Sequence, residues 1–214
     1  MNILEIRNLL GTTVFTNDTL VEILKSDIKN INEKIMRMAK NEELIRIKRG
    51  IYCLGQKYRQ NEPNPITVAN LLYTPSYVSF EYALSYYGMI PERVDEITSA
   101  TMKHPKLFST PLGRYSYRKI STNAYSIGID WHYNEQDGGR LIATPEKALC
   151  DKIRYDRGIG RMSQEEMRAY LEYDLRLDGL EKLDGELIRS IAIAYRSQNL
   201  RTLATFIAKR NFNG

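Results

Sequence analysis

Apolar side chains alternate with cationic ones in the run LIRIKRGIYCL (residues 44–54), and a Lys-Arg-Gly triplet lies in its middle. An alternation with a period of two predicts a β-strand with one buried face. Gly50 can adopt the positive φ that a tight turn between two such strands requires. The run therefore predicts a β-hairpin in which Ile45 and Ile47 face the interior. Its cationic side chains are expected to face solvent: Arg46, Lys48 and, at the tip, Arg49.

Three helices are predicted before this hairpin. The first covers residues 1–10, the second follows the capping residues 16–18, and the third runs from a cap at 26–27 to about Asn41. In the third helix one stripe is apolar and consists of Ile28, Ile31, Ile35, Met38 and Ala39. The opposite face carries polar side chains: Lys29, Asn30, Glu33, Arg37 and Lys40, with Lys34 at its edge.

Positive charge is concentrated on the third helix and the hairpin. Residues 25–60 hold ten Lys and Arg against four Asp and Glu, a net charge of +6, whereas residues 1–24 have a net charge of −2. Long cationic side chains on an exposed helix can reach base edges in the major groove, although a solvated helix face has the same composition. Together with a cationic hairpin, the helix predicts a winged helix-turn-helix over residues 1–55 that binds double-stranded DNA.

A second, larger domain is predicted over residues 66–214, after a linker at 56–65 that is rich in Asn and Pro. Its helices are expected at about 66–73, 79–88, 144–155, 184–196 and 199–210, with one more after a Ser163-x-x-Glu166 capping box. Its strands are expected at about 95–101, 114–120, 125–133 and 140–143. Strands in the middle with helices at both ends predict an α+β fold with a mixed or antiparallel sheet.

Five sequence blocks occur in an order that points to a known family. They are LIRIKRGIYCLG (44–55), PSYVSFEYALSYYGMIP (75–91), ITSATMK (97–103), TPLGRYSYRKI (110–120) and ATPEKALCDKI (143–153). In these blocks the chain resembles the AbiEi-type antitoxins of type IV toxin–antitoxin (abortive infection) systems. The resemblance covers most of the chain except about the last 50 residues.

That resemblance implies an N-terminal winged helix joined to a C-terminal antitoxin domain of mixed α/β structure. It implies repression of the protein's own operon, for which we expect an operator of inverted or repeated half-sites. It also implies action against a nucleotidyltransferase-like toxin, without requiring that the two proteins bind each other. No catalytic residue and no cofactor is implied.

A second cationic region lies within the blocks that carry the resemblance. No acidic residue occurs from Ile97 to Ile129, and three tyrosines alternate with the basic residues of this stretch. The cations are Lys103, Lys106, Arg114, Arg118 and Lys119. They could form a second surface for DNA or RNA, or a solvated face of a sheet whose other face is packed by tyrosines.

The sequence lacks the motifs that are typical of several classes of enzyme. No Gly-Lys-Ser/Thr, no G-x-S-x-G, no His-Glu-x-x-His and no Glu-x-Lys occurs. The two cysteines and two histidines are too scattered for a metal cluster. Glu146, Lys147 and Asp151 could suggest catalysis, but each position is interpreted as a helix-terminal or solvent-facing one. Ser79 is expected to cap the helix that follows it.

Two alternative functions also fit the sequence. One is a stand-alone winged-helix regulator whose C-terminal domain senses a ligand, and the other is a nuclease targeted by the winged helix. No uncharged apolar run is long enough to span a bilayer, and residues 1–10 do not resemble a signal peptide. Because two cysteines cannot build a disulfide scaffold, a cytoplasmic protein with reduced thiols is expected.

Overall fold

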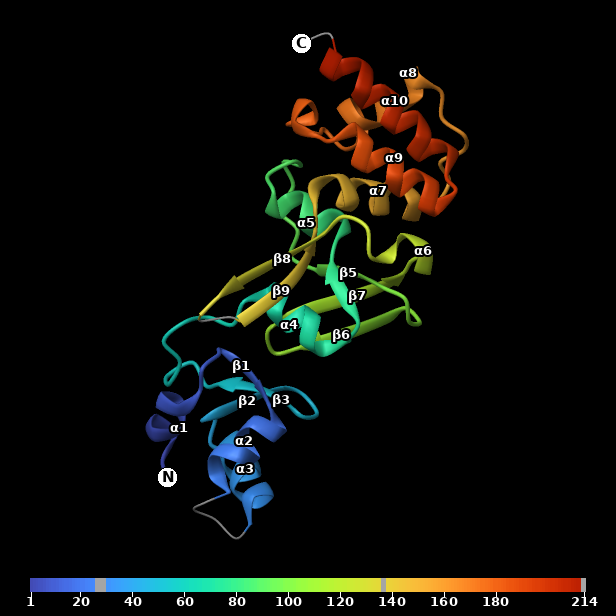
Figure 1. Cartoon of the computed structure of the whole chain (residues 1–214). Helices are drawn as coiled ribbons and strands as arrows, with labels where there is room; N and C mark the ends of the chain where they lie inside the picture. Colours follow the sequence, from blue (N-terminus) through green and yellow to red (C-terminus); the bar gives the residue numbers. More distant parts are fainter. Residues whose placement is uncertain (26–29, 136–137, 213–214) are drawn as a thin grey trace.

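The fold was analysed in a computed structural model, which describes residues 1–25, 30–135 and 138–212. The chain is α+β, as predicted, and contains a three-stranded and a six-stranded sheet. We call the elements that precede residue 55 the N-terminal unit and those that follow it the main body. Figure 1 shows the N-terminal unit at one end of the molecule and the last helices of the main body at the other.

The N-terminal unit contains three helices and the three-stranded sheet. Its elements are α1 (Ile3–Leu9), β1 (Val14–Thr16), α2 (Asn17–Leu24), α3 (Ile31–Lys40), β2 (Leu44–Lys48) and β3 (Ile51–Leu54). The predicted hairpin is present, because β2 pairs antiparallel with β3 and Gly50 has a φ of +81° in the turn. The third helix begins at an Asn30 cap, and the cap expected at Ser26-Asp27 lies outside the described residues. Strand β1 was not predicted.

Both faces of the small sheet are covered by protein. One face packs on the helices of the unit through Phe15, Leu44, Tyr52 and Leu54, which form one hydrophobic cluster with Ile35 and Met38. The other face belongs to the core of the main body through Val14, Ile47, Ile51 and Cys53, with Ile45 packed against them. Ile45 and Ile47 therefore do face an interior, but the further expectation that the apolar stripe of the third helix packs against them is wrong, because alternate residues of the hairpin belong to two different cores.

The main body is built on the six-stranded sheet, in the order β6-β7-β5-β4-β9-β8. Its strands are β4 (Ser76–Val78), β5 (Ile97–Thr101), β6 (Lys106–Thr110), β7 (Gly113–Lys119), β8 (Ile129–Asn134) and β9 (Gly138–Ala143). The sheet is mixed, because β5 runs parallel to β7 and β4 parallel to β9 while the other pairs are antiparallel. Residues 125–128, predicted as the start of a strand, instead form the end of a short helix and a turn at Gly128.

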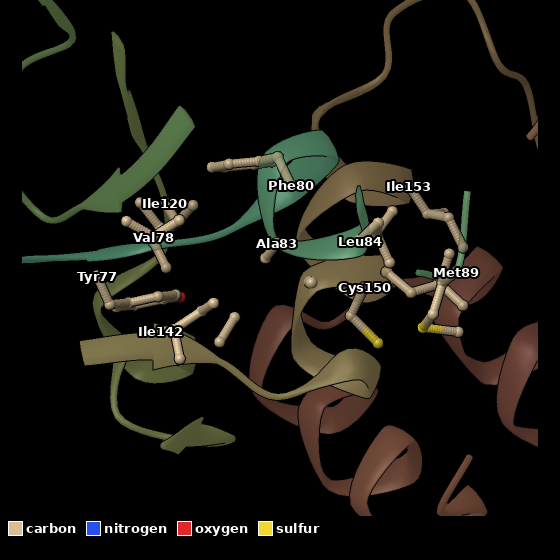
Figure 2. Close-up of a cluster of buried hydrophobic side chains, with 14 of the residues drawn as sticks. Tyr77, Val78, Phe80, Ala83, Leu84, Met89, Ile120, Ile142, Cys150 and Ile153 are labelled. Carbon is tan, nitrogen blue, oxygen red and sulfur yellow. The ribbon is translucent and has the colours of Figure 1, made fainter. Parts of the chain in front are cut away.

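The helices of the main body cover the sheet and extend beyond it. They are α4 (Pro65–Leu72), α5 (Phe80–Tyr86), α6 (Thr122–Tyr125), α7 (Pro145–Tyr155), α8 (Gln164–Ala169), α9 (Gly185–Tyr195) and α10 (Gln198–Phe212), with a π-helical turn at Tyr170–Asp174 and a 3-10 turn at Leu180–Lys182. Local caps set two of the predicted starts: Thr144 caps α7, and Ser163 with Glu166 forms the capping box of α8. In Figure 2 the core lies between the sheet, through Val78 and Ile142, and the helices α5 and α7.

Candidate nucleic-acid interface

The outward side of α3 carries polar side chains, and they differ in their exposure to solvent and in whether other groups of the protein already bind them. Asn30 accepts a hydrogen bond from the Glu33 amide and donates its own amide to the Glu33 carboxylate at 2.9 Å, so both are used at the helix start. Lys34 is half-buried and donates to the Met1 carbonyl. Arg37 and Lys40 are exposed. Lys29 lies outside the described residues.

A cleft separates α3 from the turn of the β2–β3 hairpin. Arg46 and Arg49 of the hairpin line it, opposite Asn32 and Met36 of the helix. All four side chains are exposed, and Met36 is exposed to 72%. Asn32 and Met36 were not among the predicted site residues. The helical wheel places them beside the apolar stripe, and the sequence contains no signal for the side of the helix on which the hairpin lies.

Lys48 is not a free cation at the tip of the hairpin. Its ammonium donates to the Leu72 carbonyl at 2.8 Å and lies 4.9 Å from the centre of the Phe108 ring, so it joins the N-terminal unit to the main body. Burial, together with the positive charges of Lys106 and Lys103, holds the pKa of Lys48 below its usual value. A neighbouring carboxylate would raise that pKa instead.

The three lysines 48, 103 and 106 form what we call the lysine cluster, which surrounds the rings of Tyr73 and Phe108. Lys106 lies 5.7 Å and 5.4 Å from the centres of these two rings, and Lys103 lies 5.4 Å from that of Tyr73 while donating to the Thr74 carbonyl. None of the three forms an ion pair with a carboxylate in the described part of the chain. Like charges that converge without a counter-ion repel one another and attract an anionic partner.

The other cations of the acid-free stretch are paired or lie elsewhere. Arg114 forms an ion pair with Glu96 at 3.3 Å, and Arg118 forms one with Glu81 at 2.9 Å. The Arg118 guanidinium also lies 4.7 Å from the centres of the Phe80 and Tyr155 rings. Lys119 lines a separate cleft beside α7. The five cations of this stretch therefore do not form one continuous surface, and only Lys103 and Lys106 join Lys48.

A buried ionic network occupies the middle of the main body. Lys147 and Asp151 are both 0% exposed, and their charged groups are 2.9 Å apart. The Lys147 ammonium also donates to the Ala124 carbonyl at 2.8 Å and contacts the Tyr195 hydroxyl at 3.3 Å. The interpretation of these positions as solvent-facing is wrong, because α9 and α6 cover the side of α7 that carries them.

Asp151 accepts hydrogen bonds from three further side chains in this network. Tyr77 donates at 2.9 Å and Ser79 at 2.8 Å to one carboxylate oxygen, and Tyr195 donates to the other. The expected capping role of the Ser79 side chain is therefore wrong, since its hydroxyl is used here. Burial and the neighbouring carboxylate raise the pKa of Tyr77 and of Tyr195 far above the usual tyrosine value. Every polar group of the network has a partner. The network therefore has the geometry of a structural element that holds α7, α9 and β4 together.

Among the described residues, no group of three His, Cys, Asp or Glu side chains is arranged to hold a metal ion. Nor is any helix in the described ranges both long enough and apolar enough to cross a bilayer. Comparisons of the chain with models of protein families and with curated proteins found no match.

Proposed function

We propose that this protein is a DNA-binding repressor of its own operon and the antitoxin of a type IV toxin–antitoxin system, acting against a nucleotidyltransferase-like toxin. The observation that carries the DNA-binding part is the cleft between α3 and the β2–β3 turn, which is lined by Arg46 and Arg49 without a carboxylate partner in the described residues. The antitoxin part rests on the sequence resemblance. The order of three helices and a hairpin fits a winged helix-turn-helix.

In this proposal α3 enters the major groove and the hairpin follows the backbone. Asn32 is suited to read a base, because an asparagine amide can form two hydrogen bonds with adenine. Met36 supplies apolar contact with thymine methyl groups from the next turn of the helix. Arg46 and Arg49 flank the same cleft, where their guanidinium groups can bind phosphates.

Exchanging Asn32 and Arg49 separately for alanine distinguishes base reading from phosphate binding. Asn32→Ala is expected to cost about 1–3 kcal/mol in binding to the operator and to change the preferred base at one position. Arg49→Ala should weaken binding to all sequences and reduce the slope of log K against log salt by about one contact. Both are measured by mobility shift of duplexes from the promoter region at several salt concentrations.

The control for these variants is Arg201→Ala, which removes an exposed arginine on α10 at the far end of the molecule. It should leave both the affinity and the salt slope unchanged. Unchanged operator affinity in a combined Asn32→Ala, Arg46→Ala, Arg49→Ala variant would contradict DNA binding through this cleft.

The lysine cluster offers a second test, which separates the loss of positive charge from the loss of the fold. Replacing Lys103 and Lys106 by glutamine relieves like-charge repulsion but also removes their cation–π contacts with Tyr73 and Phe108, so the free energy of unfolding is expected to stay within about 1 kcal/mol of the parent value. The same variant should lose protection when co-expressed with a nucleotidyltransferase-like toxin. A folded variant that still protects fully would show that the cluster has no part in antitoxin action.

Arg49→Ala is the matched variant for this co-expression experiment. If repression and antitoxin action use different surfaces, Arg49→Ala should lose repression and retain protection. Loss of protection in Arg49→Ala together with loss of repression would instead mean that antitoxin action depends on DNA binding.

A further inference from the structure

The end of β7, the last turns of α7 and the end of α9 enclose a cleft of about 470 Å³. Figure 1 shows α7 and α9 on the side of the six-stranded sheet away from the N-terminal unit. Three exposed cationic side chains line the cleft: Lys119 from β7, Arg154 from α7 and Arg157 from the segment that follows α7. None of them forms an ion pair in the described part of the chain.

Two carboxylates also line this cleft, and both are already neutralised. Asp151 accepts from Lys147, Tyr77, Ser79 and Tyr195 within the buried network. Asp156 forms an ion pair with Lys152 and accepts from the Tyr170 hydroxyl. Neither carboxylate therefore compensates the positive charges of Lys119, Arg154 and Arg157, which we call the rim cations.

The floor of the cleft is held in place by the buried network. Tyr195 and Asp151 belong to both, so the network fixes the last turns of α7, which carry Arg154, against the end of α9. Arg154 also acts on Tyr195, since its positive charge lowers the pKa that burial and Asp151 raise. The backbone around the cleft is thus fixed before a ligand binds, which lowers the cost of ordering on binding.

Stabilisation of a helix end is the simpler explanation for two of these cations. Arg154 lies in the last turn of α7 and Arg157 just beyond it, where positive charge complements the helix dipole. That role does not account for Lys119, which reaches the same cleft from a strand, nor for the concave shape.

We propose that this cleft binds an organic phosphate of nucleotide size. Its volume falls within the range of small-molecule sites, and arginine binds phosphate through two parallel hydrogen bonds. The Ser121 hydroxyl and the half-exposed Tyr155 ring line the same space and would contact the rest of the ligand. A phosphate of the DNA backbone has the same chemistry, but a duplex held by α3 would lie on the other side of the six-stranded sheet from this cleft. DNA binding by α3 is not required for this proposal.

Binding is measured by calorimetry on the full chain, with ATP, GTP, CTP, UTP, pyrophosphate, orthophosphate and a DNA duplex from the promoter region as separate probes. At least one nucleoside triphosphate is expected to bind with a Kd below about 1 mM. The double variant Arg154→Gln, Arg157→Gln should weaken that binding by about tenfold or more, which corresponds to about 1.4 kcal/mol. Lys119→Gln should weaken it as well, and this effect distinguishes a site from a stabilised helix end.

The control variant is Arg189→Gln, which changes an exposed arginine on α9 that pairs with Glu186 instead of facing the cleft. It should bind the probes as the parent does. Thermal unfolding without ligand shows whether the double variant is folded, and if it is not, Lys119→Gln alone decides.

Three results would overturn the proposal. The first is that no probe binds to the parent, and the second is that the folded variants bind as well as the parent. The third is that the variants lose affinity only for duplex DNA, which would assign the cations to the DNA backbone.

Discussion

Replacing Lys147 by methionine is expected to lower the free energy of unfolding by about 3–5 kcal/mol. The reason is that Asp151 would be left at a fully buried position without the only cation that pairs with it in the described residues. Methionine fills a volume similar to that of the lysine side chain, so the loss reports the charge and not a cavity. Urea unfolding followed by circular dichroism measures it.

Two further variants make this result interpretable. Lys182→Met changes an exposed lysine and should leave the free energy of unfolding within about 0.5 kcal/mol of the parent value. The double variant Lys147→Met, Asp151→Asn should lose less stability than the sum of the two single variants, because it leaves no unpaired charge. A Lys147→Met variant as stable as the parent would mean that Lys147 and Asp151 do not form a buried ion pair.

Replacing Ile35 by aspartate is expected to unfold the N-terminal unit, at a cost of about 4 kcal/mol or more. Ile35 is only 3% exposed and belongs to the cluster that joins α3 to the small sheet, so the new carboxylate would be buried among apolar side chains. Hydrogen exchange of α1 to β3, measured by mass spectrometry, should show loss of protection.

The matched control is the next residue along the helix. Met36→Asp places the same side chain at a position that is 72% exposed and should keep the amide protection of the parent. It should weaken DNA binding, however, because a negative charge would enter the cleft beside Arg46 and Arg49. Equal protection in Ile35→Asp and Met36→Asp would mean that α3 packs through another face.

The features that could be predicted from the sequence are those that local interactions determine. Thr144 and Pro145 begin α7 because a hydroxyl caps the helix and proline fits its first turn. Gly50 marks the hairpin turn because of its positive φ. Ile35 and Met38 could be assigned to the core because a stripe at helical spacing has one buried side.

The features that could not be predicted depend on distant partners. Strand β4 has no alternation because all three of its residues are buried, so it carries no period-two signal. The position of Ser79 in the sequence is that of a helix cap, but its hydroxyl donates to Asp151, which is 72 residues away. The pair formed by Lys147 and Asp151 has the spacing of an exposed helical pair, and it is the packing of α9 on α7 that buries it.

The sheet of the N-terminal unit, whose two faces serve two cores, has a consequence for any DNA that α3 binds. A DNA-binding unit joined to the main body by a flexible linker could rotate relative to that body. Here Val14, Ile51 and Cys53 belong to the core of the main body and prevent such rotation. In each bound copy the main body would then point in one fixed direction away from the axis of the DNA. Changing the spacing of two half-sites by about half a helical turn, roughly 5 base pairs, would move the two bodies from the same side of the double helix to opposite sides.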